Sequence, residues 1–319
     1  MALTKETLLE MYFRMNEARF FEEKVAWFFA RGMVHGTTHL SIGQEASGVA
    51  SCMALKKCDL VSATHRGHSQ VIGFGLDLNR ITAELLGKET GYCKGKGGSM
   101  HIADIDSGNL GANGIVGGGY AISVGAALSQ QYLKTGRVVL CFAGDGSTNE
   151  GSFHESLNLA SIWKLPVIFY IENNLYGMST SIDKHMNIKD IADRAKSYGI
   201  PGIVIDGNDA IEVYETIEKA AEHTRSGKGP ILIESKTYRW SGHSKSDAQA
   251  YRTKEEVEEW KAKDPIKRLR KYMIENEIAS EEELNKVEEN AATALEEAVE
   301  FAINSPEPKV ETVTDDVYA

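Results

Sequence analysis

The chain has 319 residues, 42% of them hydrophobic and 25% charged, which is the composition of a folded globular protein rather than a disordered one. Its formal net charge of −11 argues against nucleic acid as the main partner, because phosphate backbones attract basic surfaces. No apolar run is long enough to span a membrane, and the N-terminus lacks the pattern of a secretory signal, so no membrane partner is expected.

The four cysteines form no C-x-x-C pair, so neither a zinc knuckle nor a thioredoxin-type motif is indicated. They are Cys52, Cys58, Cys93 and Cys141. Cys141 lies in an apolar run and is expected to behave as a small buried residue. This usage of cysteine fits a reducing cytoplasm best, which is the location that we expect.

A long helix is expected over residues 4–30, because apolar residues recur there at steps of three or four, with Thr4 as a cap and Gly32 at the end. The tract 31–125 that follows is dense in glycine and histidine. Its interspersed apolar residues favour a segment that lines a binding site, where backbone approaches a ligand closely, over a disordered segment.

From there on, helical and strand patterns alternate, beginning with a helix over 121–133. Continuous apolar runs over 138–143 and 166–171 are typical of buried parallel strands, and the helix expected over 150–163 joins them into a β–α–β unit. The alternation continues through the segments 192–198, 202–205, 210–224 and 231–234. The predicted fold class is therefore α/β, a doubly wound and mostly parallel sheet.

Charged amphipathic helices are expected in the last part of the chain, beginning at Lys254, Pro265 and Ser280. We therefore divide the chain into an α/β domain over residues 1–253 and a C-terminal helical extension over residues 254–319. The extension is expected to pack on the domain or on a partner.

The main chemical signal is the motif at 144–147, GDGS, after the first buried strand, together with the motif at 172–174, ENN, after the second. Parallel neighbouring strands end at the same edge of a sheet, so Asp145 and Asn174 should meet there. With the backbone carbonyl of Tyr176 they form an oxygen ligand set with one carboxylate, which suits Mg²⁺ completed by a phosphorylated ligand. The glycines and the following helix N-terminus suit a diphosphate. The alternative is that both motifs are ordinary turns.

Two other phosphate-binding patterns do not fit. The segment 91–97, GYCKGKG, resembles a P-loop but is one residue short and lacks the hydroxyl residue after its lysine. The dinucleotide pattern G-x-G-x-x-G also fails, because Gly144 and Gly146 are not followed by a glycine at the required position. Lys94 and Lys96 are therefore expected on a solvated rim rather than against a cofactor.

Together these motifs resemble the thiamine-diphosphate fingerprint, in which GDG on one strand is followed by NN on the next. Over about residues 10–255 the chain resembles the α subunits of the thiamine-diphosphate-dependent 2-oxo acid and acetoin dehydrogenase family, a pyruvate dehydrogenase-like decarboxylase component. The matching segments are HLSIGQEA at 39–46, THRGH at 64–68, GKGGSMH at 95–101, NGIVG at 113–117, WKLPVIF at 163–169 and YRWSGHSKSD at 238–247. The resemblance implies the diphosphate-binding domain of the thiamine-diphosphate-binding fold.

The resemblance also implies roles for individual residues, with thiamine diphosphate and Mg²⁺ as cofactors. The metal would be held by Asp145, Asn174 and the carbonyl of Tyr176. The diphosphate would be contacted by Gly146, Ser147, Arg66, His243 and His65, the last of which stands where pyruvate-type members usually carry tyrosine. Backbone groups of Gly114 and Val116 would face the aminopyrimidine ring. The catalytic residues at the substrate end would be His39, His68 and His243.

Several histidines and Arg66 have a structural alternative to a role in the site. His35, His68 and His101 would then be held by loop carbonyls, Arg66 would form a surface ion pair, and His243 would be an ordinary loop residue.

Two loops are expected to become ordered when the cofactor binds, namely 178–188 and 241–253. The second loop contains Ser244, which matches a serine that is phosphorylated in some relatives.

The resemblance implies cleavage of a C–C bond next to the carbonyl of a small-molecule substrate. The acyl unit would pass to a lipoyl group on the acyltransferase core of a multienzyme complex. The activating glutamate of this family cannot be placed in the chain, so we expect it on a separate β subunit in an α2β2 heterotetramer. His65 and the run GANGIVGGG are more similar to acetoin dehydrogenases, with a pyruvate or branched-chain 2-oxo acid dehydrogenase as the alternative.

Two hypotheses of other classes remain open. An oxidoreductase that binds a nicotinamide dinucleotide would use the same kind of sheet, but the chain lacks the glycine fingerprint. A non-catalytic interaction subunit would keep the fold for assembly alone, and the intact Asp145, Asn174 and His243 argue against it.

Overall fold

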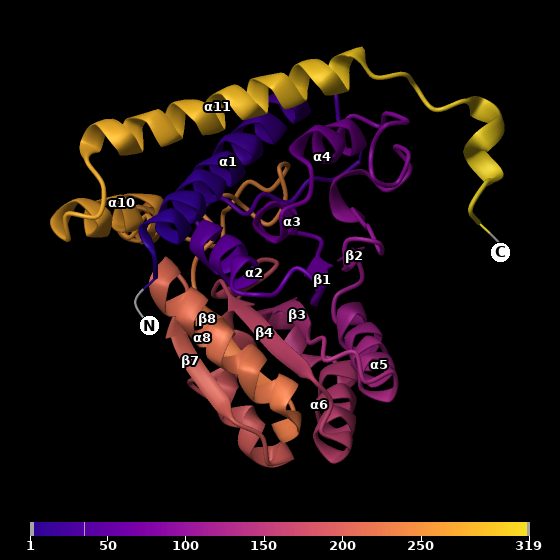
Figure 1. Cartoon of the computed structure of the whole chain (residues 1–319), viewed down its shortest axis with the longest axis vertical. Coiled ribbons are helices and arrows are strands. Elements are labelled where there is room, and N and C mark those ends of the chain that lie inside the picture. Colours follow the sequence, from indigo (N-terminus) through magenta and orange to yellow (C-terminus); the bar gives the residue numbers. More distant parts are fainter. Residues whose placement is uncertain (1–2, 35, 318–319) are drawn as a thin grey trace.

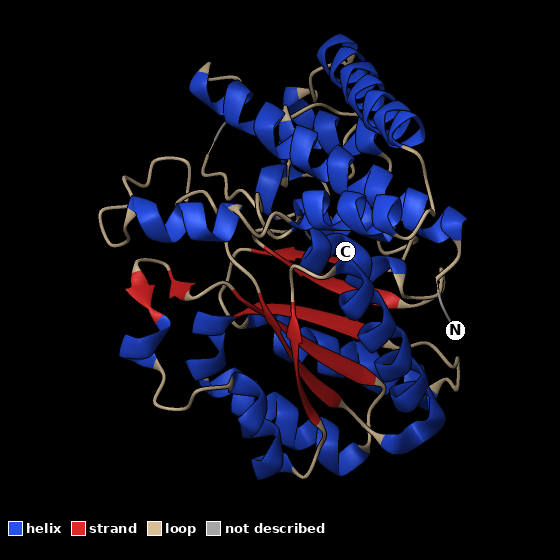
Figure 2. Ribbon diagram, turned by 90° about the vertical axis from the view of Figure 1, so that its left-hand side faces the viewer, coloured by secondary structure: helices blue, strands red, loops and turns tan. Residues whose placement is uncertain are grey.

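A computed structural model gives the positions of residues 3–34 and 36–317. A six-stranded parallel sheet lies at the centre, with helices on both faces (Figure 2). The strands run in the order β2-β1-β3-β4-β8-β7. Their bounds are β1 Leu60–Thr64, β2 Asn109–Asn113, β3 Val139–Gly144, β4 Val167–Asn173, β7 Gly202–Asp206 and β8 Ile231–Lys236. The predicted doubly wound α/β fold is confirmed.

The central strands β3, β4 and β8 are buried on both faces of the sheet, which produces continuous apolar runs, whereas the edge strand β7 is largely exposed. In β3, Leu140 and Phe142 belong to one hydrophobic core, whereas Val139 and Cys141 belong to the other. Successive side chains of a strand point to opposite faces, so β3 contributes to two cores at once. The sheet is therefore the middle layer of three.

Helices cover the first face of the sheet, where α11 lies across α1 and α4 (Figure 1). Their bounds are α1 Lys5–Ala30, α2 Ser51–Met53, α3 His68–Phe74, α4 Leu78–Leu85, α8 Ala210–His223, α10 Pro265–Glu275 and α11 Glu281–Asn304. The second face is covered by α5 Gly118–Tyr132, α6 Gly151–Trp163 and the 3₁₀ helix η4 Ile191–Tyr198.

Shorter elements lie mostly in the connections around the carboxyl edge of the sheet. They are the π-helices η1 Ala46–Ala50 and η5 Thr224–Lys228, the 3₁₀ turns η2 Gly98–Met100, η3 Asp145–Asn149 and η6 Val310–Thr314, the helices α7 Ile182–His185 and α9 Lys254–Lys261, and the two-stranded ribbon of β5 Tyr176–Gly177 and β6 Thr180–Ser181.

The tract 31–125 differs most from expectation, because it supplies β1, β2, α3 and α4, which its glycine-rich sequence did not predict. The helix expected over 192–198 is the 3₁₀ helix η4. The other expected elements are present, including three helices after residue 253, while the domain boundary there stays a prediction. His35 lies outside the described residues. Within the described chain, no helix has the length and apolar character needed to cross a membrane.

Candidate active site

A cavity of about 490 Å³ opens at the carboxyl edge of the sheet, where β1, β3 and β4 end. From β1 the chain passes to β2 at one edge and then crosses back to β3 on the other side of β1. Ligands of open α/β sheets bind at such a reversal of strand order. The cavity therefore lies where the topology of the sheet favours a binding site.

Asp145 and Asn174 both line this cavity, as the pairing of their strands predicts. They are 2% and 8% exposed, and Oδ2 of Asp145 and Oδ1 of Asn174 have no hydrogen-bond partner among the described residues. Burial raises the pKa of the Asp145 carboxyl to about 6, because loss of hydration outweighs the backbone hydrogen bonds and the arginine charges that favour the carboxylate. Two buried oxygens without partners fit a cation held between them.

Tyr176 follows this pair after a sharp turn at Leu175, whose φ of +71° places the backbone in the left-handed region. Its hydroxyl is already engaged, since it donates to both carboxylate oxygens of Glu256 at 2.9 Å. This leaves the backbone, rather than the phenol, as the part of Tyr176 that can bind a ligand in the cavity.

The glycine-rich turn between β3 and α6 forms the floor of the cavity. A Cβ added to Gly146 would come within 3.1 Å of Cα of Gly177, so the backbones of two loops approach closely here. The hydroxyl of Ser147 donates to the carbonyl of Gly144 at 2.6 Å and contacts the Tyr120 hydroxyl at 2.7 Å. A phosphate contact through this hydroxyl would have to replace one of these hydrogen bonds.

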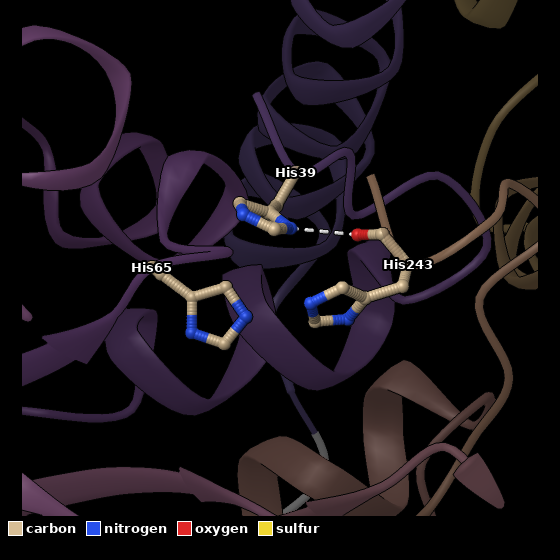
Figure 3. A group of neighbouring side chains, drawn as sticks. All are labelled: His39, His65 and His243. Carbon is tan, nitrogen blue, oxygen red and sulfur yellow. Dashed lines mark hydrogen bonds between the residues drawn. The ribbon is translucent and has the colours of Figure 1, made fainter. Parts of the chain in front are cut away.

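Three histidines meet beside the cavity, which is lined by His65 and His243 but not by His39 (Figure 3). The ring of His39 lies edge-on to His65 and His243, with centroid separations of 4.6 and 4.7 Å. Nδ1 of His39 lies 2.7 Å from the carbonyl oxygen of His243. Because a carbonyl only accepts, Nδ1 carries the hydrogen and Nε2 keeps its lone pair.

The guanidinium of Arg66 is buried beside these rings and donates to the carbonyls of Leu40 at 2.6 Å and His243 at 2.9 Å. Burial, followed by the Arg66 charge, lowers the pKa of His65 to about 3 and that of His243 to about 4. Burial also lowers the pKa of His39, so at neutral pH the three rings are uncharged.

The three imidazoles have nitrogens within 4.8 Å of one another, which is close enough to suggest a metal site. The neighbouring Arg66 and Arg239, however, both shift the histidine pKa values downward by their positive charge. A positive environment favours an anion over a second cation. The cavity thus combines a cation position at Asp145 with an anion-attracting end at the histidines.

Two further predicted residues lie elsewhere. His68 is fully buried outside the lining of the cavity, with Nε2 3.0 Å from the Ser99 hydroxyl and Nδ1 3.1 Å from a carboxylate oxygen of Glu22. This placement favours the structural alternative for His68. Gly114 lies against the ring of His101, also outside the lining, whereas Val116 lines the cavity and is half exposed.

The structure adds three residues that sequence reasoning missed. Gln44 and Glu172 line the cavity, and Glu172 has one buried carboxylate oxygen without a partner in the described chain. Arg239 is fully buried near Asp145 and His243, and its Nε and Nη1 find no acceptor among the residues that are described. All three lie within the quoted motifs, but only the tertiary contacts single them out.

The P-loop-like segment 91–97 does not reach this cavity, and its amides are already occupied. The buried carboxylate of Glu84 accepts four backbone N–H groups at 2.7 to 3.0 Å. They belong to Cys93, Gly95, Gly97 and Gly98. A Cβ on Gly91 would collide with Glu84, which explains the glycine. Lys94 and Lys96 contact Asp316 at the surface, on the rim where they were expected.

Comparison with known proteins gives the family of the chain. Residues 13–311 match the family described as dehydrogenase E1 component. The chain belongs to this family. Its relatives include the acetoin:2,6-dichlorophenolindophenol oxidoreductase subunits alpha of Bacillus subtilis, 47% identical with 100% of this chain and 95% of the relative covered, and of Cupriavidus necator, 43% identical with 99% and 95% covered.

The pyruvate dehydrogenase E1 component subunit alpha of Porphyra purpurea is 41% identical, with 99% of this chain and 94% of the relative covered. The predicted family resemblance is confirmed, and the chain is an E1 dehydrogenase component. Membership of this family implies the use of thiamine diphosphate. The alternative of a nicotinamide-dinucleotide oxidoreductase receives no support from these relatives.

Proposed function

We propose that this chain is the α subunit of an acetoin dehydrogenase that holds thiamine diphosphate through Mg²⁺. The observation that carries the proposal is the pair of buried, unpartnered oxygens on Asp145 and Asn174 at one wall of the cavity. With the carbonyl of Tyr176 they would give Mg²⁺ its protein ligands, and phosphate and water would complete the coordination.

Residues of the histidine cluster and of the turn after β3 suit the diphosphate. Arg66 would donate to its oxygens, as would the neutral imidazoles of His65 and His243 and the backbone of Gly146 and Ser147. The closely spaced charges of Arg66 and Arg239 supply the positive potential that a diphosphate needs in a chain of net charge −11.

Bound thiamine diphosphate would supply the chemistry that cleaves a C–C bond next to a carbonyl. Val116 and Gly114 would offer backbone groups to its aminopyrimidine ring. His39 holds an Nε2 lone pair toward the cluster of rings and would accept a proton there. His68, with both ring nitrogens in contact with buried groups, would position the loops rather than meet substrate.

A separate β subunit would supply the activating glutamate and complete an α2β2 heterotetramer. The relatives support this assembly, because they are named as alpha subunits. A lipoyl acyltransferase would then receive the acyl unit. The cytoplasm remains the expected compartment, in agreement with four cysteines that form no disulfide.

Acetoin is proposed over pyruvate because the two relatives of 47% and 43% identity are named for acetoin, and because His65 replaces the tyrosine expected of pyruvate-type members. The enzyme assembled with its β subunit should reduce 2,6-dichlorophenolindophenol faster with acetoin than with pyruvate or branched-chain 2-oxo acids. Faster reduction with pyruvate would reverse this assignment. Full turnover by the chain alone would remove the β subunit from the proposal.

Calorimetric titration of the full chain, alone and with its β subunit, tests the cofactor site. Thiamine diphosphate should bind in the presence of Mg²⁺ and weaken at least tenfold in EDTA. The substitution Asp145→Asn keeps the shape of the side chain but removes its charge. It should abolish the dependence of thiamine diphosphate binding on Mg²⁺. Asp183→Asn, at an exposed position of α7, is the matched control. Equal binding by both variants would contradict the proposed metal site.

A further inference from the structure

Helix α9, in the C-terminal part of the chain, packs against two segments that border the cavity. Glu256, in its first turn, accepts hydrogen bonds from two tyrosines that are far apart in sequence. The Tyr176 hydroxyl lies 2.9 Å from each carboxylate oxygen, and the Tyr238 hydroxyl lies 2.8 Å from Oε1. One carboxylate therefore joins the turn after β4 to the segment after β8.

Both tyrosines are buried, at 8% and 0% exposure. Burial, with a further contribution from Glu256, raises the pKa of Tyr176 to about 12 and also raises that of Tyr238. The phenols therefore remain donors at any working pH. The ring of Tyr238 also stacks on Trp260 of α9, with 5.2 Å between centroids and an interplanar angle of 5°. The helix is thus fixed to Tyr238 at two points.

Both of these segments contribute residues to the lining of the cavity. Tyr176 lies two residues beyond Asn174, and its carbonyl is the third metal ligand in the proposed function. Tyr238 precedes Arg239 and the segment that holds His243. A shift of either phenol moves backbone that borders the metal–diphosphate position, so the geometry of this end depends on a side chain outside the lining.

We propose that Glu256 is a positioning residue for the metal–diphosphate end of the cavity. It touches neither cofactor nor substrate, and it acts by holding the turn at Tyr176 and the segment from Tyr238 to His243 at a fixed separation. The inference rests on the proposed function for the identity of the ligand. It goes beyond that function by assigning a site role to the C-terminal helical extension.

The test compares Glu256→Ala and Glu256→Gln in the full chain, with Glu255→Ala, an exposed neighbour in the same turn, as the matched control. Hydrogen exchange is measured first, without cofactor. Glu256→Ala should raise exchange at least tenfold in residues 174–182 and 239–247, with the rest of the sheet unchanged. Glu256→Gln, which keeps one acceptor oxygen, should lie between this variant and the wild type.

The dissociation constant of thiamine diphosphate with Mg²⁺ is then measured on the chain assembled with its β subunit. Glu256→Ala should raise this constant at least tenfold, and Tyr176→Phe should reproduce part of the increase. The inference would be overturned if Glu256→Ala exchanged at the wild-type rate in both segments, or if Glu255→Ala had an equal effect. A wild-type enzyme that binds no thiamine diphosphate would overturn the proposed function instead, and the exchange measurement would still decide whether Glu256 holds the two segments.

Discussion

Two glycine-rich segments of this molecule have backbone amides that suit an anion, and they differ in what those amides meet. The segment 91–98 wraps around the carboxylate of Glu84, which belongs to the same chain. The turn 144–147 borders an open cavity, where Oδ2 of Asp145 and Oδ1 of Asn174 lack partners within the described chain. Glycine spacing alone therefore does not identify a phosphate site. The decisive feature is whether the chain already supplies the anion.

The largest effect is expected at Glu84. Glu84→Gln leaves one acceptor oxygen and turns an amide donor toward other N–H donors, so buried N–H groups of the segment 91–98 lose their partner. We expect a loss of about 3 kcal/mol in the free energy of unfolding, measured with urea. Affinity for thiamine diphosphate should stay within twofold of wild type. Loss of affinity without loss of stability would mean that this segment belongs to the cofactor site.

The second effect concerns Arg66, which follows β1 and lines the same cavity as the turn 144–147. Arg66→Met removes the charge-assisted hydrogen bonds that the proposed diphosphate would receive, which are worth about 2 kcal/mol, or roughly 30-fold in affinity. The dissociation constant is measured by titration with Mg²⁺ present. His154→Gln, a substitution on α6 outside the cavity lining, serves as the control. An unchanged dissociation constant for Arg66→Met would mean that Arg66 does not bind the diphosphate.

The third effect depends on pH. Burial raises the pKa of Asp247, but hydrogen bonds from the Tyr251 hydroxyl and from the backbone N–H groups of Gln249 and His243 outweigh it and lower this pKa to about 2. A lowered pKa means that the charged carboxylate stabilises the segment fully above the ordinary value of about 4. That stabilisation is lost as the pH falls toward 2.

Hydrogen exchange in residues 241–252, corrected for intrinsic rates, should therefore stay slow at pH 5 and increase at pH 2.5. Asp247→Asn should reproduce the fast exchange at pH 7, since it mimics the protonated acid in charge. Exchange that is independent of pH in the wild type, or unaffected by this substitution, would show that Asp247 does not organise the segment.

The smallest effect is expected at the two lysines of the segment 91–98, which surrounds Glu84. Lys94 and Lys96 pair with Asp316 at the surface, where ion pairs contribute about 0.5 kcal/mol or less. The double substitution to Met should change urea stability by no more than about that amount and leave the affinity for thiamine diphosphate unchanged. A tenfold weakening of cofactor binding would instead make the P-loop-like segment a second phosphate site.

The sequence by itself determined the strands β3, β4 and β8, because strands buried on both faces leave continuous apolar runs. The largely exposed edge strand β7 followed from the alternation of strands and helices. It also indicated that Asp145 and Asn174 lie at the same edge of the sheet, where both line the cavity, because parallel neighbours end at one edge. It did not reveal β1 and β2, whose short sequences LVSAT and NLGAN mix polar and small residues within a glycine-rich tract. Such strands are defined by the neighbours that pair with them.

Only the tertiary structure decided which side chains complete the site. It placed Glu84 inside the segment 91–98, buried His68 against Glu22, and brought Arg239 and Glu256 to the ends of strands from distant parts of the chain. The physical reason is that the sequence does not show whether a given carboxylate or guanidinium contacts water, a backbone amide or a ligand. Its partner is fixed by long-range packing, which no local pattern records.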